Sequence, residues 1–367
     1  MIEQDDVIIH FWQDIIDQAV LAKASDIHVE PENGVSHIRL RVDGRLSHLA
    51  SSPAHWHDRI ASRVKILARL DIAEKRLPQD GQMQVIAAHH ENPVACRIST
   101  LPTIHGEKIV VRLLNQQAND LDIGKIGLTQ QQLSDLLTCL NRTQGLILVT
   151  GPTGSGKTKT LYSCLKYLLD GSRNITSIED PVEIQLKGIN QVPINEKAGL
   201  RFDVALRALM RQDPDIIMVG EIRDHETAQI ALQASETGHL VLATLHANDA
   251  PSTISRLQQL GCSSSQIANN VSCITAQRLV RIFCQSCNGH SSSTCDTCQG
   301  SGFDGRRAVH QVMPITESIQ QMIEQGSPIA AIKAEAQTSG VLTLLQSGQL
   351  LVAKNMTSFE EVKRQLA

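Results

Sequence analysis

Apolar and polar positions follow two different rhythms in the first third of the chain. From Val7 to Val20, apolar pairs recur every four residues, which predicts an amphipathic helix packed against a core. A second helical pattern runs from Ile60 to Leu70. Strand-like runs occupy residues 27–30, 38–42, 83–87, 95–101 and 108–114. We therefore expect a small α+β domain with an antiparallel sheet over residues 1–114.

The pattern changes after these strands. A polar stretch with two glycines, residues 115–128, predicts a linker, and Thr129 fits the N-cap of a following helix. Short apolar runs then alternate with helical patterns, as in a parallel sheet covered on both faces. The runs are Leu146–Thr150, Ile175–Ile178, Ile216–Val219 and Leu240–Leu245. This predicts an α/β domain over residues 129–283. We assign residues 304–367 to a C-terminal helical region, because helical periodicity returns within it.

A glycine-rich stretch follows the first apolar run of the second domain. It fits the G-x-x-x-x-G-K-[ST] phosphate loop, with a strand before it and a helix-compatible stretch after it. The eight residues are Gly151, Pro152, Thr153, Gly154, Ser155, Gly156, Lys157 and Thr158. Here the glycines let backbone amides face phosphate oxygens, the lysine reaches the β- and γ-phosphates, and the threonine offers a hydroxyl to Mg²⁺. Eight positions in register disfavour a chance turn, so we expect a nucleoside-triphosphate site.

Candidate catalytic groups stand after the other three strands. The carboxyl ends of parallel strands share one edge of a sheet, where such domains place their sites. Glu179 and Asp180 follow the second run, Glu221 follows the third, and His246 follows the fourth. Glu221 suits polarisation of an attacking water, while Mg²⁺ would rely on Thr158, phosphate oxygens and water. His246 is a candidate sensor of the γ-phosphate, although a lone histidine is more often structural.

Arginines are frequent in the predicted strands of the first domain. They are Arg39, Arg41, Arg45, Arg97 and Arg112. Such residues usually form the solvated face of a sheet. The alternative is that some of them meet the triphosphate of the second domain, or of a neighbouring subunit, as arginine fingers. The sequence pattern leaves both interpretations open.

Two C-x-x-C pairs stand seven residues apart. They are Cys284 with Cys287 and Cys295 with Cys298. Two such pairs suit four thiolates around tetrahedral Zn²⁺, whereas a redox dithiol would need only one pair. Because protein would fill all four positions, we expect a structural zinc element, which we assign to residues 284–303.

The composition excludes some classes of protein. Hydrophobic residues make up 41% of the chain and charged residues 20%, as in ordinary globular proteins. The net charge of −4 and the 2% of aromatic residues argue against a nucleic-acid partner. No apolar run approaches the roughly 18 residues that cross a bilayer, and the acidic N-terminus is unlike a secretory signal. We therefore expect a cytoplasmic protein without a transmembrane segment.

Several segments, in this order, resemble the secretion ATPases of type II secretion and type IV pilus biogenesis. Residues 151–158, 177–183, 209–224 and 237–249 resemble that family's Walker A, Asp box, Walker B and His box motifs. In the first domain, residues 25–28, 41–44, 78–81 and 97–107 look like the family's N-terminal domain. The resemblance covers nearly the whole chain. It implies a PAS-like α+β domain joined to a RecA-like P-loop ATPase, with six copies in a ring.

The resemblance also implies roles for individual residues. Glu221 would be the catalytic glutamate, with Glu179 and Asp180 assisting through metal or water. His246 and His239 would read the γ-phosphate of ATP. The family arginines that reach the nucleotide from the first domain would be Arg97 and Arg112.

The cysteine element resembles the assembly and secretion branch of the family, because retraction motors generally lack it. The chain starts at the PAS-like domain, without the extra N-terminal domain of type II secretion ATPases, which favours a pilus-type system. The expected function is a hexameric ATPase motor, peripheral at the cytoplasmic face of the inner membrane, which drives pilus or pseudopilus assembly through a platform protein. The alternatives are type II secretion, pilus retraction, a DNA translocase, or a zinc-ribbon adaptor with a vestigial nucleotide site.

Overall fold

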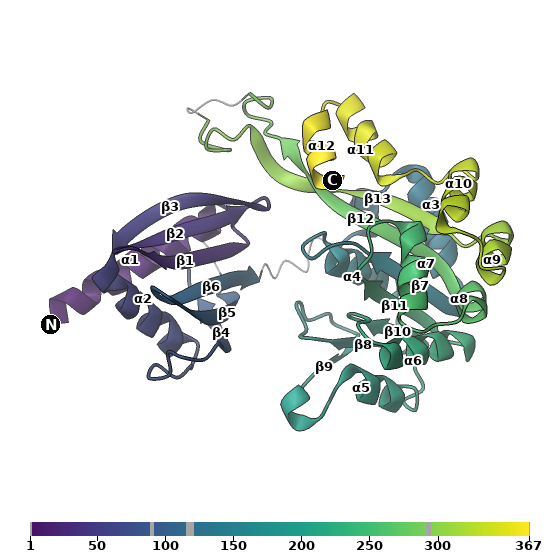
Figure 1. Cartoon of the computed structure of the whole chain (residues 1–367), viewed down its shortest axis with the longest axis horizontal. Coiled ribbons are helices and arrows are strands. Elements are labelled where there is room, and N and C mark those ends of the chain that lie inside the picture. Colours follow the sequence, from purple (N-terminus) through teal and green to yellow (C-terminus); the bar gives the residue numbers. More distant parts are fainter. Residues whose placement is uncertain (1, 89–91, 115–120, 291–294, 367) are drawn as a thin grey trace. The chain divides into compact units, whose positions relative to one another are not determined.

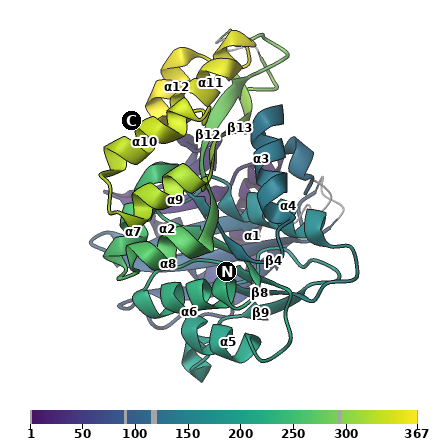
Figure 2. The same cartoon turned by 90° about the vertical axis from the view of Figure 1, so that its right-hand side faces the viewer.

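The computed structural model describes residues 2–88, 92–114, 121–290 and 295–366, and of residues 2–5 the backbone alone (Figures 1 and 2). The chain divides into two compact units, Met1–Gln117 and Ala118–Ala367. Among the described helices, none has both the length and the apolar character that a membrane span requires.

The first unit is a six-stranded antiparallel sheet with two helices packed on one face (Figure 1). The strand order is β3-β2-β1-β6-β5-β4. The elements are α1 (Ile2–Leu21), β1 (Asp26–Glu32), β2 (Val35–Val42), β3 (Arg45–Pro53), α2 (Ala54–Leu67), β4 (Gln79–Val85), β5 (Val94–Thr103) and β6 (Gly106–Leu114). The predicted α+β domain with an antiparallel sheet is confirmed.

Alternation along the strands separates the two faces of this sheet. Ile27 and Val29 of β1 are buried in a core that also contains Trp12 of α1 and Ile60 of α2. Since successive strand residues point to opposite faces, Asp26 lies on the other, polar face. The strand β3 was not predicted, because its polar sequence lacks a clear alternation.

The second unit has a seven-stranded sheet in the order β13-β12-β7-β11-β10-β8-β9. Neighbouring strands are parallel, except that β13 is antiparallel to β12. The strands are β7 (Gly145–Thr150), β8 (Ile175–Glu179), β9 (Asn190–Pro193), β10 (Ile216–Val219), β11 (Leu240–Leu245), β12 (Val271–Phe283) and β13 (Phe303–Pro314). The four strands predicted for this domain are therefore present.

Helices cover both faces of the second sheet (Figures 1 and 2). They are α3 (Gln130–Leu140), α4 (Lys157–Leu168), α5 (Phe202–Leu209), α6 (His225–Glu236), α7 (Ala250–Gln259), α8 (Ser264–Asn270), α9 (Glu317–Glu324), α10 (Ile329–Thr338), α11 (Leu344–Ala353) and α12 (Phe359–Leu366). Along β7, Leu146 and Leu148 enter one core, while Ile147 and Val149 enter the other. Thr129 caps α3 through a capping box, as its position predicted.

The boundary of the predicted C-terminal helical region is wrong. Residues 304–314, assigned to that region, belong to β13, and the helices begin at Glu317. The strand was not predicted because polar residues interrupt its apolar pattern. His310 and Gln311 are buried: Nε2 of His310 donates to the carbonyl oxygen of Ile126, and the side-chain oxygen of Gln311 accepts from the amide of Ala250.

Candidate nucleotide site and cysteine centre

The phosphate-loop residues connect β7 to α4. Gly156 stands at the N-cap of α4 with φ +88°, in the left-handed region that favours glycine. A Cβ atom on Gly151 would lie 2.5 Å from the carbonyl oxygen of Gln277. Backbone conformation at Gly156 and packing at Gly151 therefore require glycine.

The side chain of Lys157 folds back onto the start of the loop. Its ammonium donates to the carbonyl oxygens of Gly151 and Pro152, at 2.9 and 3.1 Å. Burial lowers the pKa of Lys157, the nearby Glu221 carboxylate works against this, and Arg278 adds to it.

Other features of the loop also suit phosphate binding. In the described part of the chain, the hydroxyl of Ser155 is buried without a hydrogen-bond partner. Thr153 and Gly154 are exposed, and Thr158 is half-buried in the first turn of α4. The loop thus fits a phosphate chain, with Thr158 placed to offer its hydroxyl to Mg²⁺.

Gln277 of β12 holds the phosphate loop through its side chain, and no sequence pattern predicted this role. Its amide nitrogen donates to the carbonyl oxygen of Ser155 at 2.7 Å. Its amide oxygen accepts from the hydroxyl of Thr160 in α4, also at 2.7 Å. All three groups are buried, so Gln277 ties the loop and the following helix to the neighbouring strand.

Glu221 and His246 meet next to the phosphate loop. Nε2 of His246 lies 2.9 Å from Oε1 of Glu221, and Nδ1 lies 3.0 Å from the carbonyl oxygen of Gly151. The other carboxylate oxygen of Glu221 lies 2.8 Å from Arg223. The structure thus brings the predicted glutamate, histidine and loop together, and adds Arg223.

Glu179 lies in a buried hydrogen-bond network. The hydroxyl of Tyr162 donates to one carboxylate oxygen. Ser177 and Gln191 donate to the other, at 2.5 and 3.0 Å. Burial, followed by the contact with Glu179, raises the pKa of Tyr162. With both oxygens engaged by protein donors, these contacts favour a structural role for Glu179 over the predicted catalytic one.

The remaining candidates of the second unit lie at opposite ends of the parallel strands. Asp180 is exposed at the carboxyl end of β8, close enough to Arg223 to support its charge. His239 precedes β11, beside Gly145 at the amino end of β7, and its ring contacts the carbonyl oxygen of Ala234. The phosphate loop lies beyond the other end of β7. His239 therefore lies away from the phosphate loop of its own chain, and its predicted role at the γ-phosphate stays a prediction.

In the first unit, the two predicted arginines occupy one cross-strand row. Arg41, Asp26, Arg112 and Arg97 are successive partners across β2, β1, β6 and β5. Arg112 and Arg41 approach the two carboxylate oxygens of Asp26, at 2.9 and 3.6 Å. Nε and one terminal nitrogen of Arg97 are buried without a hydrogen-bond partner among the described residues. The row therefore carries three guanidinium groups around one carboxylate.

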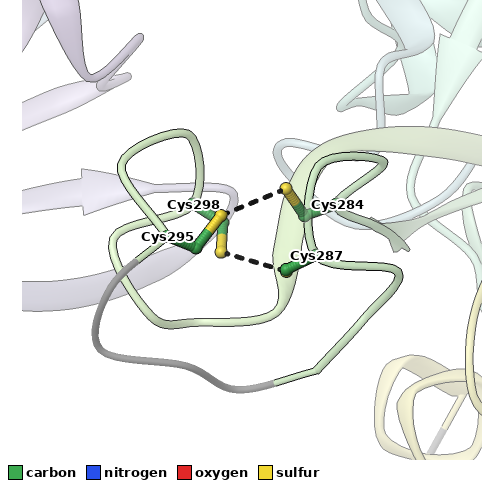
Figure 3. Close-up of side chains that lie close together, drawn as sticks. All are labelled: Cys284, Cys287, Cys295 and Cys298. Atoms are coloured by element: carbon green, nitrogen blue, oxygen red, sulfur yellow. Dashed lines mark hydrogen bonds between the residues drawn. The ribbon is translucent and has the colours of Figure 1, made fainter.

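The four cysteines of the two C-x-x-C pairs converge (Figure 3). Their sulfur atoms all lie within 4.8 Å of one another. Cys284 and Cys295 are 3.9 Å apart, and Cys287 and Cys298 are 3.6 Å apart. Zn–S bonds of about 2.3 Å in a tetrahedron place sulfurs about 3.8 Å apart, so the donor set fits zinc.

The cysteine cluster sits at the tip of an extended hairpin (Figure 1). Pairing of β12 with β7 ends at Ala276, and beyond it β12 pairs with β13 alone. We call this extension, residues 277–283 and 303–310, the arm. It begins at Gln277, under the phosphate loop, and leads directly into Cys284.

The C-terminal helices are pinned to the arm. Arg281 of the arm and Glu361 of α12 form a buried ion pair at 2.7 Å. The hydroxyl of Thr357 donates to the carbonyl oxygen of Arg281, and the carbonyl oxygen of Met356 accepts from the amide of Phe283.

A phosphate loop at the carboxyl end of a parallel strand, with a glutamate and a histidine after neighbouring strands, defines a P-loop NTPase. Comparison with known proteins makes the class more specific. Residues 2–364 match the family model described as Type II/IV secretion system protein, and the chain belongs to this family of ATPases.

Relatives of three kinds are similar to the chain. It is 43% identical to the Type II secretion system protein HxcR of Pseudomonas aeruginosa, over 97% of this chain and 77% of the relative. It is 45% identical to the Protein transport protein HofB homolog of Escherichia coli, over 96% and 80%. It is 40% identical to the Type IV pilus assembly ATPase PilB of Acinetobacter baylyi, over 97% and 66%.

Solved structures share the fold. The pilus retraction motor PilT with bound ADP matches with a TM-score of 0.66 and 26% identity, over 96% of each chain. The ATPase DotB of Legionella pneumophila matches with a TM-score of 0.74 and 18% identity, over 96% of this chain and 94% of that one. The predicted fold, a PAS-like unit followed by a RecA-like ATPase unit, is confirmed.

Proposed function

We propose that this chain is the ATP-hydrolysing motor that assembles type IV pilus or pseudopilus subunits. It would act as a ring of six copies at the cytoplasmic face of the inner membrane, through a platform protein. Relatives at 40–45% identity are named for pilus assembly, type II secretion and protein transport, which supports this class of machine. The observation that carries the activity is the bridge that His246 makes between the phosphate loop and Glu221.

Each residue of the site has a proposed task. Lys157 would leave the loop carbonyls for the β- and γ-phosphates of ATP. Glu221, held by His246 and Arg223, would orient water for attack on the terminal phosphorus and accept its proton. His246 would sense whether the terminal phosphate is present, because its ring already touches both the loop and the catalytic carboxylate. Asp180 would assist through water or metal.

Two metal ions complete the proposal. When bound, Mg²⁺ would neutralise phosphate charge, and Thr158 would contribute a hydroxyl to it. One Zn²⁺ would be held by the four cysteines at the tip of the arm. Four thiolates leave no position for substrate, so this ion would stabilise the tip rather than take part in hydrolysis.

A turnover assay with the full chain tests the ATPase. Glu221→Gln removes the carboxylate but keeps the size of the side chain. It should lower kcat by at least about 100-fold while ATP binding persists. Glu236→Gln, an exposed glutamate at the end of α6, is the matched control. Unchanged turnover in Glu221→Gln would overturn the proposed site.

Cells that lack the chain distinguish the machines. Surface fibres would be counted by electron microscopy after complementation with wild type or Glu221→Gln. Bald cells restored by wild type alone are expected for an assembly motor. Excess fibres that do not retract would indicate a retraction motor. Normal fibres with exoproteins trapped in the periplasm would favour type II secretion, the alternative supported by the similarity to HxcR.

A further inference from the structure

A cavity of about 340 Å³ opens beside the phosphate loop, within the second unit. One wall consists of the start of the loop and the segment after β11. The other wall is α7. Gly151, Pro152, His246 and Asn248 lie in the first wall.

The α7 wall is polar and fixed in place. Ser252, Ser255, Arg256 and Gln259 follow the i, i+3, i+4, i+7 spacing of a single helix face. The opposite side of α7 is buried: Ala250, Ile254 and Leu257 belong to the hydrophobic core. The hydrophobic core therefore holds the helix that forms this wall in place.

The chemistry of the cavity favours an anion. None of its nine lining residues carries a carboxylate. Arg256 is half-buried, and in the described part of the chain it has no ion-pair partner. On the opposite wall, Arg278 donates to the carbonyl oxygen of Asn248 at 2.9 Å, and the Asp249 carboxylate lies close enough to support the charge of this second arginine. Arginine without a carboxylate partner is suited to bind phosphate oxygens.

The position of the cavity points to the terminal phosphate. Lys157, which would meet the β- and γ-phosphates, donates to the carbonyl oxygens of Gly151 and Pro152, two lining residues. His246, also a lining residue, contacts Glu221. Attack of water on the terminal phosphorus breaks its bond to the bridging oxygen and yields ADP, inorganic phosphate and a proton. In the proposed ATPase site, the phosphate would therefore be released next to this cavity.

We propose that the cavity is a transient binding site through which inorganic phosphate leaves, with Arg256 as its main binding group. The inference rests on the proposed ATPase function. Arg256 holds the released phosphate away from ADP, and the hydroxyl of Ser255 assists. Departure of phosphate then becomes a step separate from departure of ADP.

Inhibition of the full-chain ATPase by each product tests this site. In Arg256→Ala, the concentration of inorganic phosphate needed for half inhibition should rise about tenfold, because charge-assisted hydrogen bonds are lost. Inhibition by ADP should change less than twofold. Arg256→Lys should give an intermediate value. Arg207→Ala, an exposed arginine on α5, is the matched control and should behave as wild type.

Two results would overturn the proposal. Equal phosphate inhibition in Arg256→Ala and wild type would show that Arg256 does not bind phosphate. Parallel shifts for phosphate and ADP would place Arg256 at the nucleotide itself. If Arg256→Ala does not fold, Ser255→Asp replaces it, since a carboxylate on the same wall should weaken phosphate inhibition likewise. Absence of turnover in wild type would instead refute the proposed ATPase function.

Discussion

At the scale of single residues, we expect removal of the Gln277 side chain to weaken ATP binding through the phosphate loop. Its side chain makes two buried hydrogen bonds, to Ser155 and Thr160. In Gln277→Ala both hydrogen bonds would be lost, and each contributes about 1 kcal/mol to stability. We expect the free energy of unfolding to fall by about 2 kcal/mol and ATP affinity to fall several-fold. Calorimetry and binding of a fluorescent ATP analogue would measure these.

The control for this prediction is Gln233→Ala, which removes an exposed glutamine from α6. An unaltered ATP affinity in Gln277→Ala, alongside normal folding, would contradict the idea that β12 supports the loop. An equal loss in the control would show that the effect is not specific to the loop.

Residue types and spacing predicted those site residues that each stand inside a recognisable motif. Lys157, Glu221 and His246 each follow a predicted strand, and the fold brings them together. Gln277 could not be found this way, because it reaches the loop from more than 100 residues away in sequence. Glu179 shows the opposite difficulty: an acid after a strand can face the loop or the core, and donors such as Tyr162 decide which.

At the scale of elements, the ion pair between the arm and α12 should make stability depend on pH. Burial alone would raise the pKa of Glu361, but hydrogen bonds from Arg281, Arg364 and Gln365 lower it from 4.5 to about 2. A carboxyl with a lowered folded-state pKa stabilises the protein above its unfolded-state pKa, near 4.5. This stabilisation is lost as the pH falls toward 2.

Comparison of wild type with Glu361→Gln isolates this effect. The stability advantage of wild type should be complete at pH 7 and should shrink by about 3 kcal/mol as the pH falls to 2. Denaturant unfolding at several pH values would measure it. Glu360→Gln, the exposed neighbour on α12, should keep the pH dependence of wild type. A constant difference between wild type and Glu361→Gln would rule out this carboxylate as the titrating group.

The cysteine centre gives a second prediction at this scale. Wild type purified from zinc-supplemented cells should contain one zinc ion per chain by elemental analysis. Cys287→Ser should lose it, because three thiolates bind the ion less tightly than four. Cys262→Ser, at a buried cysteine outside the cluster, should retain it. Metal-free wild type, or zinc retained in Cys287→Ser, would contradict a four-cysteine site.

Elements were predictable where one period dominated. The four apolar runs of the second domain became β7, β8, β10 and β11, because strands buried on both faces consist of continuous apolar residues. The strands β12 and β13 were missed. They mix buried polar residues such as Gln277 and His310 with apolar ones, and the partners of those polar groups lie far away in sequence.

At the scale of the whole molecule, motif order alone indicated the family, and the match over residues 2–364 confirms it. Sequence could not place the arginines of the first unit, because their row exists only once four strands are paired. That row has three guanidinium groups and one carboxylate, so it suits contact with a polyanion. Arg97, with two buried nitrogens lacking partners among the described residues, is its least satisfied member.

Arg97 and Arg112 are predicted to engage the terminal phosphate of ATP. If they do, replacing either one by alanine should lower kcat at least tenfold and leave ATP binding nearly intact. The reason is that such arginines act mainly on the transition state. Arg45→Ala, an exposed arginine outside the row, is the control.

Mixing Arg97→Ala chains with Glu221→Gln chains then identifies which chain donates the arginine. In mixed rings, an intact Arg97 from one chain can meet an intact Glu221 of another only if the arginine acts between subunits. Recovered turnover would therefore mean donation by a neighbour, and no recovery would mean donation within the chain. Full activity in both arginine variants would refute the arginine role itself and leave the row as a solvated face of the sheet.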